Sequence, residues 1–263
     1  MDHYRSTCED ITVPNLRFAA PKERRVAIIT GGARGLGRAA ALRLAEEGRD
    51  IVIADLLDEQ GQATVHEIQA LGQEALYFHT DVTDEVAVHE MVAQTVEHFD
   101  RLDILVCCAG ILGWEKPFLE QTAAQFDKVM KINVYGVFYA HQATIPHMLA
   151  RGWGRCVTIT SGARHGATNQ VPYGVSKGAV YSFIGALGNA YPKQNVFVNG
   201  VEPGRALTDM VVPRFTPEFL ANPGNPIGRY SDPEEVAEVI EFLTSERNTY
   251  TSGSVWSVKG ATG

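Results

Sequence analysis

The sequence predicts an α/β protein: one doubly wound domain whose seven-stranded parallel sheet is covered by helices on both faces. Three observations support this fold class. Short β-branched runs alternate with longer helical stretches along the 263 residues, which favours parallel strands joined by right-handed crossovers. Most of the runs are apolar almost throughout, as strands buried on both faces require. A glycine-rich turn directly follows the first run.

The elements are expected in alternating order. Apolar runs such as Val-Ala-Ile-Ile-Thr predict strands at residues 26–30, 51–54, 75–79, 104–107, 156–160, 196–199 and 254–258. Helical patterning between them predicts helices at residues 36–48, 58–71, 84–99, 122–150, 173–191 and 233–244. Gly48 and Gly72 are typical of helix ends, and Asp232 followed by Pro233 is typical of a helix start.

Two segments fall outside this pattern. Residues 1–22 are expected to form a polar arm, for which disorder is one option, ahead of a single dinucleotide-binding and catalytic domain at 23–263. Residues 205–230 contain four prolines and two glycines, too many for a regular layer. We expect a mobile segment on the substrate side there, and an excursion with only a structural role is the alternative.

Composition excludes several classes of function. The net charge of −8, from 23 basic and 31 acidic residues, disfavours binding to nucleic acid. Apolar runs are too short for a membrane span, and the first 22 residues lack the apolar core of a signal peptide. The four cysteines and the histidines do not form a metal-binding pattern. We therefore expect a cytoplasmic protein with reduced thiols, no metal, and no membrane or nucleic-acid partner.

The glycine-rich turn at residues 30–37 predicts a phosphate site of the Rossmann type. Glycines permit a tight turn and let the backbone approach a pyrophosphate at a helix N-terminus. A purely structural turn is the alternative, but the position between a strand and a helix favours the dinucleotide. The candidate cofactor residues in the turn are Gly31, Arg34, Gly35, Leu36 and Gly37.

The cofactor is predicted to be NAD, with NADP less favoured. Asp55 closes the second strand and can accept hydrogen bonds from the adenosine ribose, and its charge would repel a 2′-phosphate. Leu56 follows it and adds no cation. Arg34 is the opposing observation, because a cation in the turn could pair with that phosphate. A solvated carboxylate at a strand end is the alternative for Asp55.

Tyr173 and Lys177 form the sharpest local feature. Four residues apart on a helix, their side chains share one face, about 6 Å apart along the axis. An ammonium beside a phenol stabilises the phenolate and lowers its pKa from about 10. The pair is therefore a candidate acid–base unit for a hydroxyl or carbonyl, although an isolated Tyr/Lys pair is usually a surface feature.

Six separated motifs place this pair in context: residues 30–37, 108–110, Asn133, Ser161, Tyr173 with Lys177, and 203–204. In this order they resemble the short-chain dehydrogenase/reductase family, in its short single-domain branch, from residue 25 to about 260. The resemblance implies an oxidoreductase that interconverts a secondary alcohol and a ketone by hydride transfer. It also implies a homo-oligomer, most often a tetramer packed through the helices at 122–150 and 173–191.

The resemblance also implies roles for individual residues. Tyr173 would be the general acid/base, Lys177 would lower its pKa and hold the nicotinamide ribose, and Ser161 would polarise the substrate oxygen. Asn133 would hold a water that links Lys177 to solvent. The remaining implied cofactor contacts are Asp81 and Val82 at the adenine, Cys108, Ala109 and Gly110 along the cofactor, and Pro203, Gly204 and Thr208 at the nicotinamide end.

The sequence departs from the family pattern at three places. Cys107 and Cys108 replace two asparagines before Ala109 and Gly110, so amide hydrogen bonds are lost there. Ser161 lies one residue nearer to Tyr173 than is usual, and Thr160 has the usual spacing. We favour Ser161 because a following loop can absorb a deletion. Arg205 stands where a small or apolar residue is expected, and faces either an acidic substrate group or solvent.

The substrate pocket is the least determined part of the site. Its main candidates are Trp114, Ala163, His165 and Arg205, with Leu112, Gly113 and Tyr191 as further ones. Arg164, Arg205 and Arg214 could gather around a carboxylate. The alternative functions are a non-catalytic, dinucleotide-sensing binding protein, and an epimerase or dehydratase of the longer branch. Few residues follow 203–204, which leaves little room for the latter's extra substrate region.

Overall fold

The computed structural model describes residues 24–208, 216–217, 221 and 223–261. The arm expected at residues 1–22 and Arg214 lie outside the described residues. The predicted α/β class is confirmed, because seven parallel strands form one sheet in the order β3-β2-β1-β4-β5-β6-β7. The strands are β1 Val26–Thr30, β2 Asp50–Asp55, β3 Ala75–His79, β4 Ile104–Cys107, β5 Gly154–Ile159, β6 Val196–Pro203 and β7 Val255–Val258.

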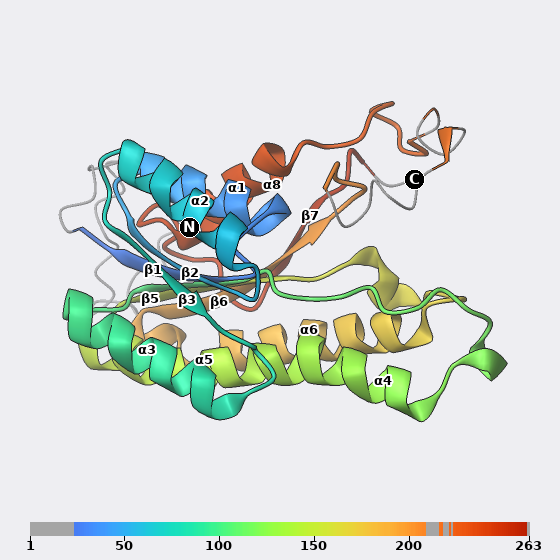
Figure 1. The fold of residues 1–263 in the computed structure, drawn as a ribbon, viewed down its shortest axis with the longest axis horizontal. Coiled ribbons are helices and arrows are strands. Elements are labelled where there is room, and N and C mark those ends of the chain that lie inside the picture. Colours follow the sequence, from blue (N-terminus) through green and yellow to red (C-terminus); the bar gives the residue numbers. More distant parts are fainter. Residues whose placement is uncertain (1–23, 209–215, 218–220, 222, 262–263) are drawn as a thin grey trace, which may run out of the picture.

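Helices cover both faces of this sheet (Figure 1). One face carries α1 (Gly35–Glu46), α2 (Asp58–Ala70) and α8 (Pro233–Thr244). The other carries α3 (Glu85–Phe99), α4 (Ala123–Met130), α5 (Gly136–Arg151) and α6 (Val171–Ala190). Within the described ranges, three short 3-10 helices also lie in the loops: η2 Phe118–Glu120, η4 Gly162–His165 and η5 Pro192–Gln194.

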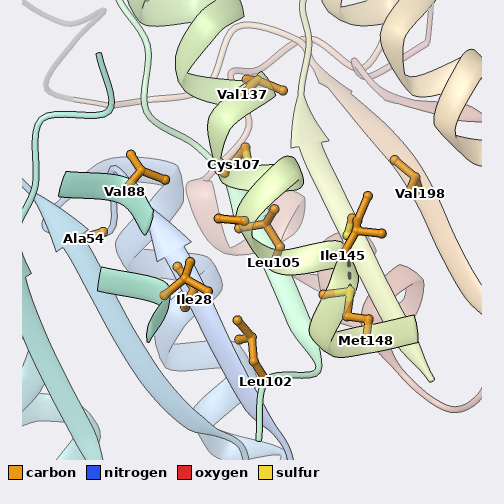
Figure 2. Packing of buried hydrophobic residues seen from close by; sticks show 14 of the residues in the cluster. Ile28, Ala54, Val88, Leu102, Leu105, Cys107, Val137, Ile145, Met148 and Val198 are labelled. Atoms are coloured by element: carbon orange, nitrogen blue, oxygen red, sulfur yellow. Dashed lines mark hydrogen bonds between the residues drawn. The ribbon is translucent and has the colours of Figure 1, made fainter. Parts of the chain in front are cut away.

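Alternate residues of each strand pack into separate cores. In β1, Ala27 and Ile29 face the cluster under α1, α2 and α8, whereas Val26 and Ile28 face the cluster under α3, α5 and α6. Figure 2 shows part of the second cluster, where Ile28, Leu105 and Met148 gather between the sheet and α5. Two fully covered faces explain why these strands are apolar throughout.

Three element boundaries differ from the sequence expectation in an informative way. The helix expected at 122–150 is continuous but contains a π-helical turn, η3 (Lys131–Tyr135), between α4 and α5. Strand β6 extends to Pro203 rather than ending near residue 199, because β7 pairs with it from Gly200 onward. Helix α6 begins at Val171, with Pro172 in its first turn, where a missing N–H costs nothing.

The expected helix ends and the expected helix start are confirmed. Gly48 and Gly72 have φ angles of +81° and +88°, in the left-handed region that favours glycine. At the start of α8, the amide of Asp232 donates to the Glu235 carboxylate at 3.0 Å, and Pro233 occupies the first turn. No helix within the described residues is long and apolar enough to span a membrane.

Candidate active site at the carboxyl edge of the sheet

The candidate residues gather at the carboxyl ends of the central strands. The order β3-β2-β1-β4-β5-β6-β7 reverses direction between β1 and β4, and such a switch point is where doubly wound sheets bind ligands. The glycine-rich turn follows β1, residues 108–110 follow β4, Ser161 follows β5, and residues 203–204 end β6. Segments far apart in the sequence therefore meet at one edge (Figure 1).

The glycine-rich turn packs tightly against the segment after β4. Gly31 has φ +68°, and a Cβ on it would lie 2.6 Å from the Ala109 amide nitrogen. A Cβ on Gly37 would lie 2.1 Å from the Gly31 carbonyl oxygen. Both positions therefore require glycine, as the close-approach argument predicted.

The start of α1 supplies unpaired backbone donors. The first intrahelical bond runs from the Arg38 amide to the Arg34 carbonyl. No side chain caps this helix end and no acidic residue lies in its first turn, within the described part of the chain. The amides of Gly35, Leu36 and Gly37 precede that first bond and are available to an anion. This donor set fits the pyrophosphate of a dinucleotide.

The Asp55 side chain is hydrogen-bonded to the same turn. One carboxylate oxygen accepts from the Ala33 amide at 3.0 Å, and the other accepts from the amides of Leu56 and Leu57 at 2.8 and 3.2 Å. The side chain is therefore oriented by three backbone donors beside the glycine-rich turn. Its contact with an adenosine ribose stays a prediction.

The other candidates at the adenine end have distinct surroundings. Arg34 is exposed and forms no ion pair with any described residue. Leu56 is 52% exposed. Val82 is buried against the start of α5, where a Cβ on Gly136 would lie 2.8 Å from its Cγ2. Asp81 is exposed and accepts from the Thr83 amide at 2.8 Å.

Asn133 sits inside the π-helical turn η3 and is fully buried. Its Oδ1 accepts from the Ile111 amide at 2.9 Å, and its Nδ2 donates to the Ile111 carbonyl at 2.9 Å and to the Ser176 hydroxyl at 3.0 Å. Irregular π turns often mark functional positions in helices. Here the turn directs Asn133 at the segment after β4. Its contact with a water that links Lys177 to solvent stays a prediction.

Lys177 is almost fully buried, and its ammonium donates to the Ile159 carbonyl at 2.8 Å. A Cβ on Gly110 would lie 3.9 Å from this Nζ and 3.2 Å from Asn133 Oδ1, so residues 109–110, η3 and α6 converge. Burial lowers the pKa of Lys177 to about 8. The ammonium is therefore still mostly protonated at neutral pH.

Tyr173 is half-buried one turn before Lys177, whose Nζ lies 5.7 Å from the centre of the phenol ring. The helix geometry predicted this juxtaposition. Burial raises the pKa of Tyr173 above its ordinary value, and the nearby Ser161 side chain lowers it in part. The expected lowering by Lys177 stays a prediction for the complex with cofactor and substrate.

The choice between Ser161 and Thr160 has a geometric answer. The Thr160 hydroxyl is buried and donates to the Val201 carbonyl at 3.3 Å. The Ser161 side chain is partly exposed, lies close enough to the Tyr173 phenol to lower its pKa, and accepts from the Ala163 amide at 3.2 Å. Only Ser161 places a hydroxyl beside the phenol, despite the unusual spacing in the sequence.

Cys107 is the last residue of β4 and Cys108 is the next residue, and their side chains face opposite sides of the sheet. Cys107 belongs to the core under α5 (Figure 2), and Cys108 packs against the core on the opposite face. Burial raises the pKa of Cys107 to about 12 and that of Cys108 further above its ordinary value. Both thiols are therefore neutral, and the Cys108 amide donates to the Thr30 carbonyl at 3.0 Å.

At the nicotinamide end, Gly204 donates its amide to the Val258 carbonyl at 2.7 Å. A Cβ on Gly204 would lie 2.9 Å from Lys259 Cα, so the segment after β7 closes over the end of β6. Thr208 reaches back toward the glycine-rich turn, since its side-chain carbons lie 3.6 Å from a Cβ built on Gly35. Pro203 and Thr208 are both partly buried.

The substrate-pocket candidates do not all converge. Trp114 is 38% exposed, with Lys128 Nζ 6.0 Å from its ring centre. Ala163 packs on α6, where a Cβ on Gly174 would lie 2.9 Å from its carbonyl oxygen. His165 and Arg205 are exposed, and Arg205 donates to the Pro223 carbonyl at 3.2 Å. Arg164 is instead turned toward the interior, where it pairs with Glu202.

Ser176 and Glu202 lie near the site but were not predicted from the sequence. Ser176 is fully buried, accepts from Asn133 and donates to the Tyr173 carbonyl at 2.7 Å; its place beside Lys177 was the available signal. Glu202 is a buried carboxylate directly before Pro203, and a charge in an otherwise apolar strand could have drawn attention to it.

A pocket of about 250 Å³ is lined in part by Gly204, Arg205 and Lys259. Its lining does not include Tyr173, Lys177 or Ser161.

The chain is similar in sequence and in fold to several dehydrogenases and reductases. The chain is 35% identical over 240 residues to the (2S)-[(R)-hydroxy(phenyl)methyl]succinyl-CoA dehydrogenase subunit BbsD of Thauera aromatica, covering 90% of this chain and 96% of the relative. It is 35% identical to a cyclohexanol dehydrogenase of Rhodococcus sp. (strain TK6), covering 91% and 96%. The crystal structure of levodione reductase superimposes with a TM-score of 0.85 at 34% identity, covering 90% and 96%.

Solved neighbours have been described with either nicotinamide dinucleotide. A xylitol dehydrogenase bound to NAD⁺ has a TM-score of 0.84 at 29% identity, covering 90% of this chain and 98% of that one. The structure titled ElxO with NADP bound has a TM-score of 0.84 at 26% identity, covering 90% and 98%. The family binds a nicotinamide dinucleotide, and the neighbours do not decide which one.

A family model described as short chain dehydrogenase matches residues 25–218. This range includes the glycine-rich turn, Asn133, Ser161, Tyr173 and Lys177. With most of the chain matched by the model and the curated relatives, the protein belongs to the short-chain dehydrogenase/reductase family and is an oxidoreductase.

Proposed function

We propose that this protein is an NAD-dependent dehydrogenase that interconverts a secondary alcohol and a ketone. The observation that carries the proposal is the convergence of Tyr173, Lys177 and Ser161 beside the expected nicotinamide end. When bound, NAD supplies the hydride acceptor for the reaction. Two relatives are named as dehydrogenases of cyclohexanol and of cis-4-hydroxycyclohexanecarboxylate, which makes cyclic secondary alcohols the first substrates to test.

In this proposal Tyr173 moves the proton. During oxidation its phenolate oxygen takes the hydroxyl proton, the carbon-bound hydrogen leaves with its electron pair, and a carbonyl forms. The Ser161 hydroxyl holds the substrate oxygen and lies close to the Tyr173 phenol. The buried ammonium of Lys177 favours the phenolate by its charge. Asn133 keeps residues 109–111 in place beside Lys177 through its bonds to Ile111.

The choice of NAD rests on Asp55. Its carboxylate is oriented by the amides of Ala33, Leu56 and Leu57, so a 2′-phosphate would meet a fixed negative charge at the end of β2. Arg34 is exposed and offers the opposing cation. A substrate screen run with both cofactors tests the choice, and better turnover with NADP would overturn it.

The acid–base role is tested by Tyr173→Phe. We expect kcat for a cyclic alcohol to fall by about 10²- to 10⁴-fold, since general acid–base catalysis contributes about that much. Binding of NADH, followed by fluorescence, should change little. Retained turnover would refute the role of Tyr173. A wild-type protein that binds NADH but oxidises no alcohol would instead favour the dinucleotide-sensing function.

We also propose that the protein is cytoplasmic and forms a homotetramer through α5 and α6. Phe138 on α5 and Val175 and Tyr181 on α6 are each more than two-fifths exposed, an apolar surface suited to subunit contact. Gel filtration with a mass measurement tests the assembly, and a monomer at micromolar concentration would contradict it. Microscopy of a fluorescent fusion tests the location.

A further inference from the structure

Glu202 places a carboxylate in the interior next to the site. It is the penultimate residue of β6, directly before Pro203, and its side chain is fully buried. A buried carboxylate without a partner costs so much that such groups are paired or neutralised. The partners of Glu202 therefore show which segments this charge holds together.

Two cations from different segments pair with Glu202. Arg164 donates its Nε to Oε2 of the carboxylate, and Lys259 pairs with Oε1. Arg164 belongs to η4, and Lys259 is the first residue after β7. Burial alone would raise the pKa of Glu202, but the ion pairs with Lys259 and Arg164 outweigh it and hold the pKa below its ordinary value. The carboxylate is therefore ionised.

Arg164 also contacts the helix that carries Tyr173. Its guanidinium stacks over the Tyr181 ring at 4.0 Å from the ring centre. Tyr181 lies one helical turn after Lys177 and two turns after Tyr173 on α6. A single side chain thus links η4, α6 and β6, which carry the serine, the tyrosine–lysine pair and the nicotinamide-end residues.

The turn fixed in this way is the one that orients Ser161. Ser161 is the N-terminal cap of η4, and its hydroxyl accepts from the Ala163 amide and lies close enough to the Tyr173 phenol to lower its pKa. Ala163 rests on Gly174 of α6. A displacement of η4 would move the serine hydroxyl away from the phenol, and a misplacement of about 1 Å is enough to cost roughly 10²-fold in rate.

We propose that Glu202, through Arg164 and Lys259, is a positioning residue that holds the Ser161 turn against Tyr173 during the dehydrogenase reaction. The expected effect on kcat rests on the proposed dehydrogenase function. It also removes Arg164 from the substrate side, because its guanidinium is committed to Glu202 and Tyr181. Buried ion pairs add little net stability, so a geometric role accounts better for an ionic cluster at this place.

The test compares Glu202→Gln with a matched control, Glu241→Gln. Glu241 is also a buried carboxylate in an ion pair, with Arg247, but it lies on α8, on the sheet face away from Tyr173. For Glu202→Gln we expect kcat to fall by about 10- to 100-fold, with KM for NAD changed less than about threefold. Glu241→Gln should lose comparable thermal stability and keep its kcat.

Two further readouts separate positioning from general stability. Alcohol oxidation rises with pH as Tyr173 loses its proton, and this rise should move to higher pH in Glu202→Gln. The reason is that a displaced Ser161 hydroxyl no longer lowers the Tyr173 pKa. Arg164→Met should reproduce both effects, and Arg164→Lys should recover part of kcat. Unchanged kcat and pH dependence in Glu202→Gln, or an equal loss of kcat in Glu241→Gln, would overturn the inference.

Amide hydrogen exchange distinguishes failure of this inference from failure of the proposed function. Exchange over residues 161–166 should be faster in Glu202→Gln than in the wild type, whatever substrate the enzyme uses, and unchanged in Glu241→Gln. Unaltered exchange in Glu202→Gln refutes the positioning role even if the wild type is an active dehydrogenase. A wild type without alcohol oxidation, but with faster exchange in the variant, refutes only the proposed reaction.

Discussion

At the scale of a single residue, burial of Lys177 disfavours its charged form, although the proposed chemistry needs that charge. The residue is 6% exposed, and its ammonium donates to the Ile159 carbonyl at 2.8 Å. Burial lowers its pKa from 10.5 to about 8, which corresponds to a penalty on the charged form on the order of 3 kcal/mol. The proposed function explains why a charge is kept there, since it faces the phenol of Tyr173.

Replacing Lys177 by Met should therefore abolish turnover without destabilising the fold at pH 7. The sign of the pH effect follows from the lowered pKa. Between pH 8 and 10.5 the unfolded lysine binds a proton and the folded one does not, so the stability of the wild type rises with pH relative to the variant. Urea unfolding at several pH values measures this difference. The prediction would be contradicted if the difference in unfolding free energy between the wild type and Lys177→Met did not change between pH 8 and 10.5. It would also be contradicted if the exposed control Lys193→Met gave the same pH dependence.

At the scale of elements, the π-helical turn η3 connects the long α4–α5 helix to the site. A regular helix would direct residue 133 elsewhere, whereas the π turn lets Asn133 bond both backbone groups of Ile111 and the Ser176 hydroxyl. The side-chain amide of Asn133 in η3 thus connects the segment after β4, through Ile111, with α6, through Ser176. The glycine at position 110 permits the close approach, because a Cβ there would crowd Asn133.

Asn133→Ala should cost about 2–4 kcal/mol of unfolding free energy, because buried backbone groups of Ile111 lose their partner. It should also slow turnover, since residues 109–111 are released beside Lys177. Asn199→Ala is the matched control: Asn199 is equally buried and bonds the Thr251 carbonyl and Ser254 amide, away from Tyr173. Urea unfolding and kcat measure both effects, and an equal loss of kcat in the two variants would argue against a local role for η3.

For the whole molecule, the two apolar cores lie on opposite faces of the sheet and the chemistry lies at its carboxyl edge. Leu102 precedes β4 at the opposite, amino edge and is fully buried (Figure 2). The molecule thus separates residues that hold the sheet together from residues that act at its edge. Changes at Leu102 should affect stability alone.

Leu102→Ala should lower the free energy of unfolding by about 2–5 kcal/mol, the usual effect of a cavity at a buried leucine. For a chain of this size that lowers Tm by about 2–4 °C per kcal/mol. The kcat measured well below Tm should stay unchanged, and exposed Leu71→Ala should alter neither quantity. Calorimetry and turnover check this, and a fall in kcat for Leu102→Ala below its Tm would show that the core and site are coupled.

Much of the fold could be predicted because its signals are local. Strands covered on both faces are apolar runs, so all seven were placed, three of them with the bounds of β1, β3 and β4. Helix periodicity predicted that Tyr173 and Lys177 share a face of α6, and the glycines predicted the tight turn between β1 and α1. The extension of β6 was missed because Glu202 and Pro203 do not resemble a strand without β7 beside them.

The sequence by itself determined the fold class, the family, the glycine-rich turn and the tyrosine–lysine pair, because each rests on short runs or motifs, or on their order along the chain. The tertiary structure decided which hydroxyl meets the phenol, since the Thr160 side chain is engaged with β6 and that of Ser161 is not. It also decided that Arg164 pairs with Glu202, 38 residues away. Such partners are set by how distant segments pack, and local periodicity does not encode them.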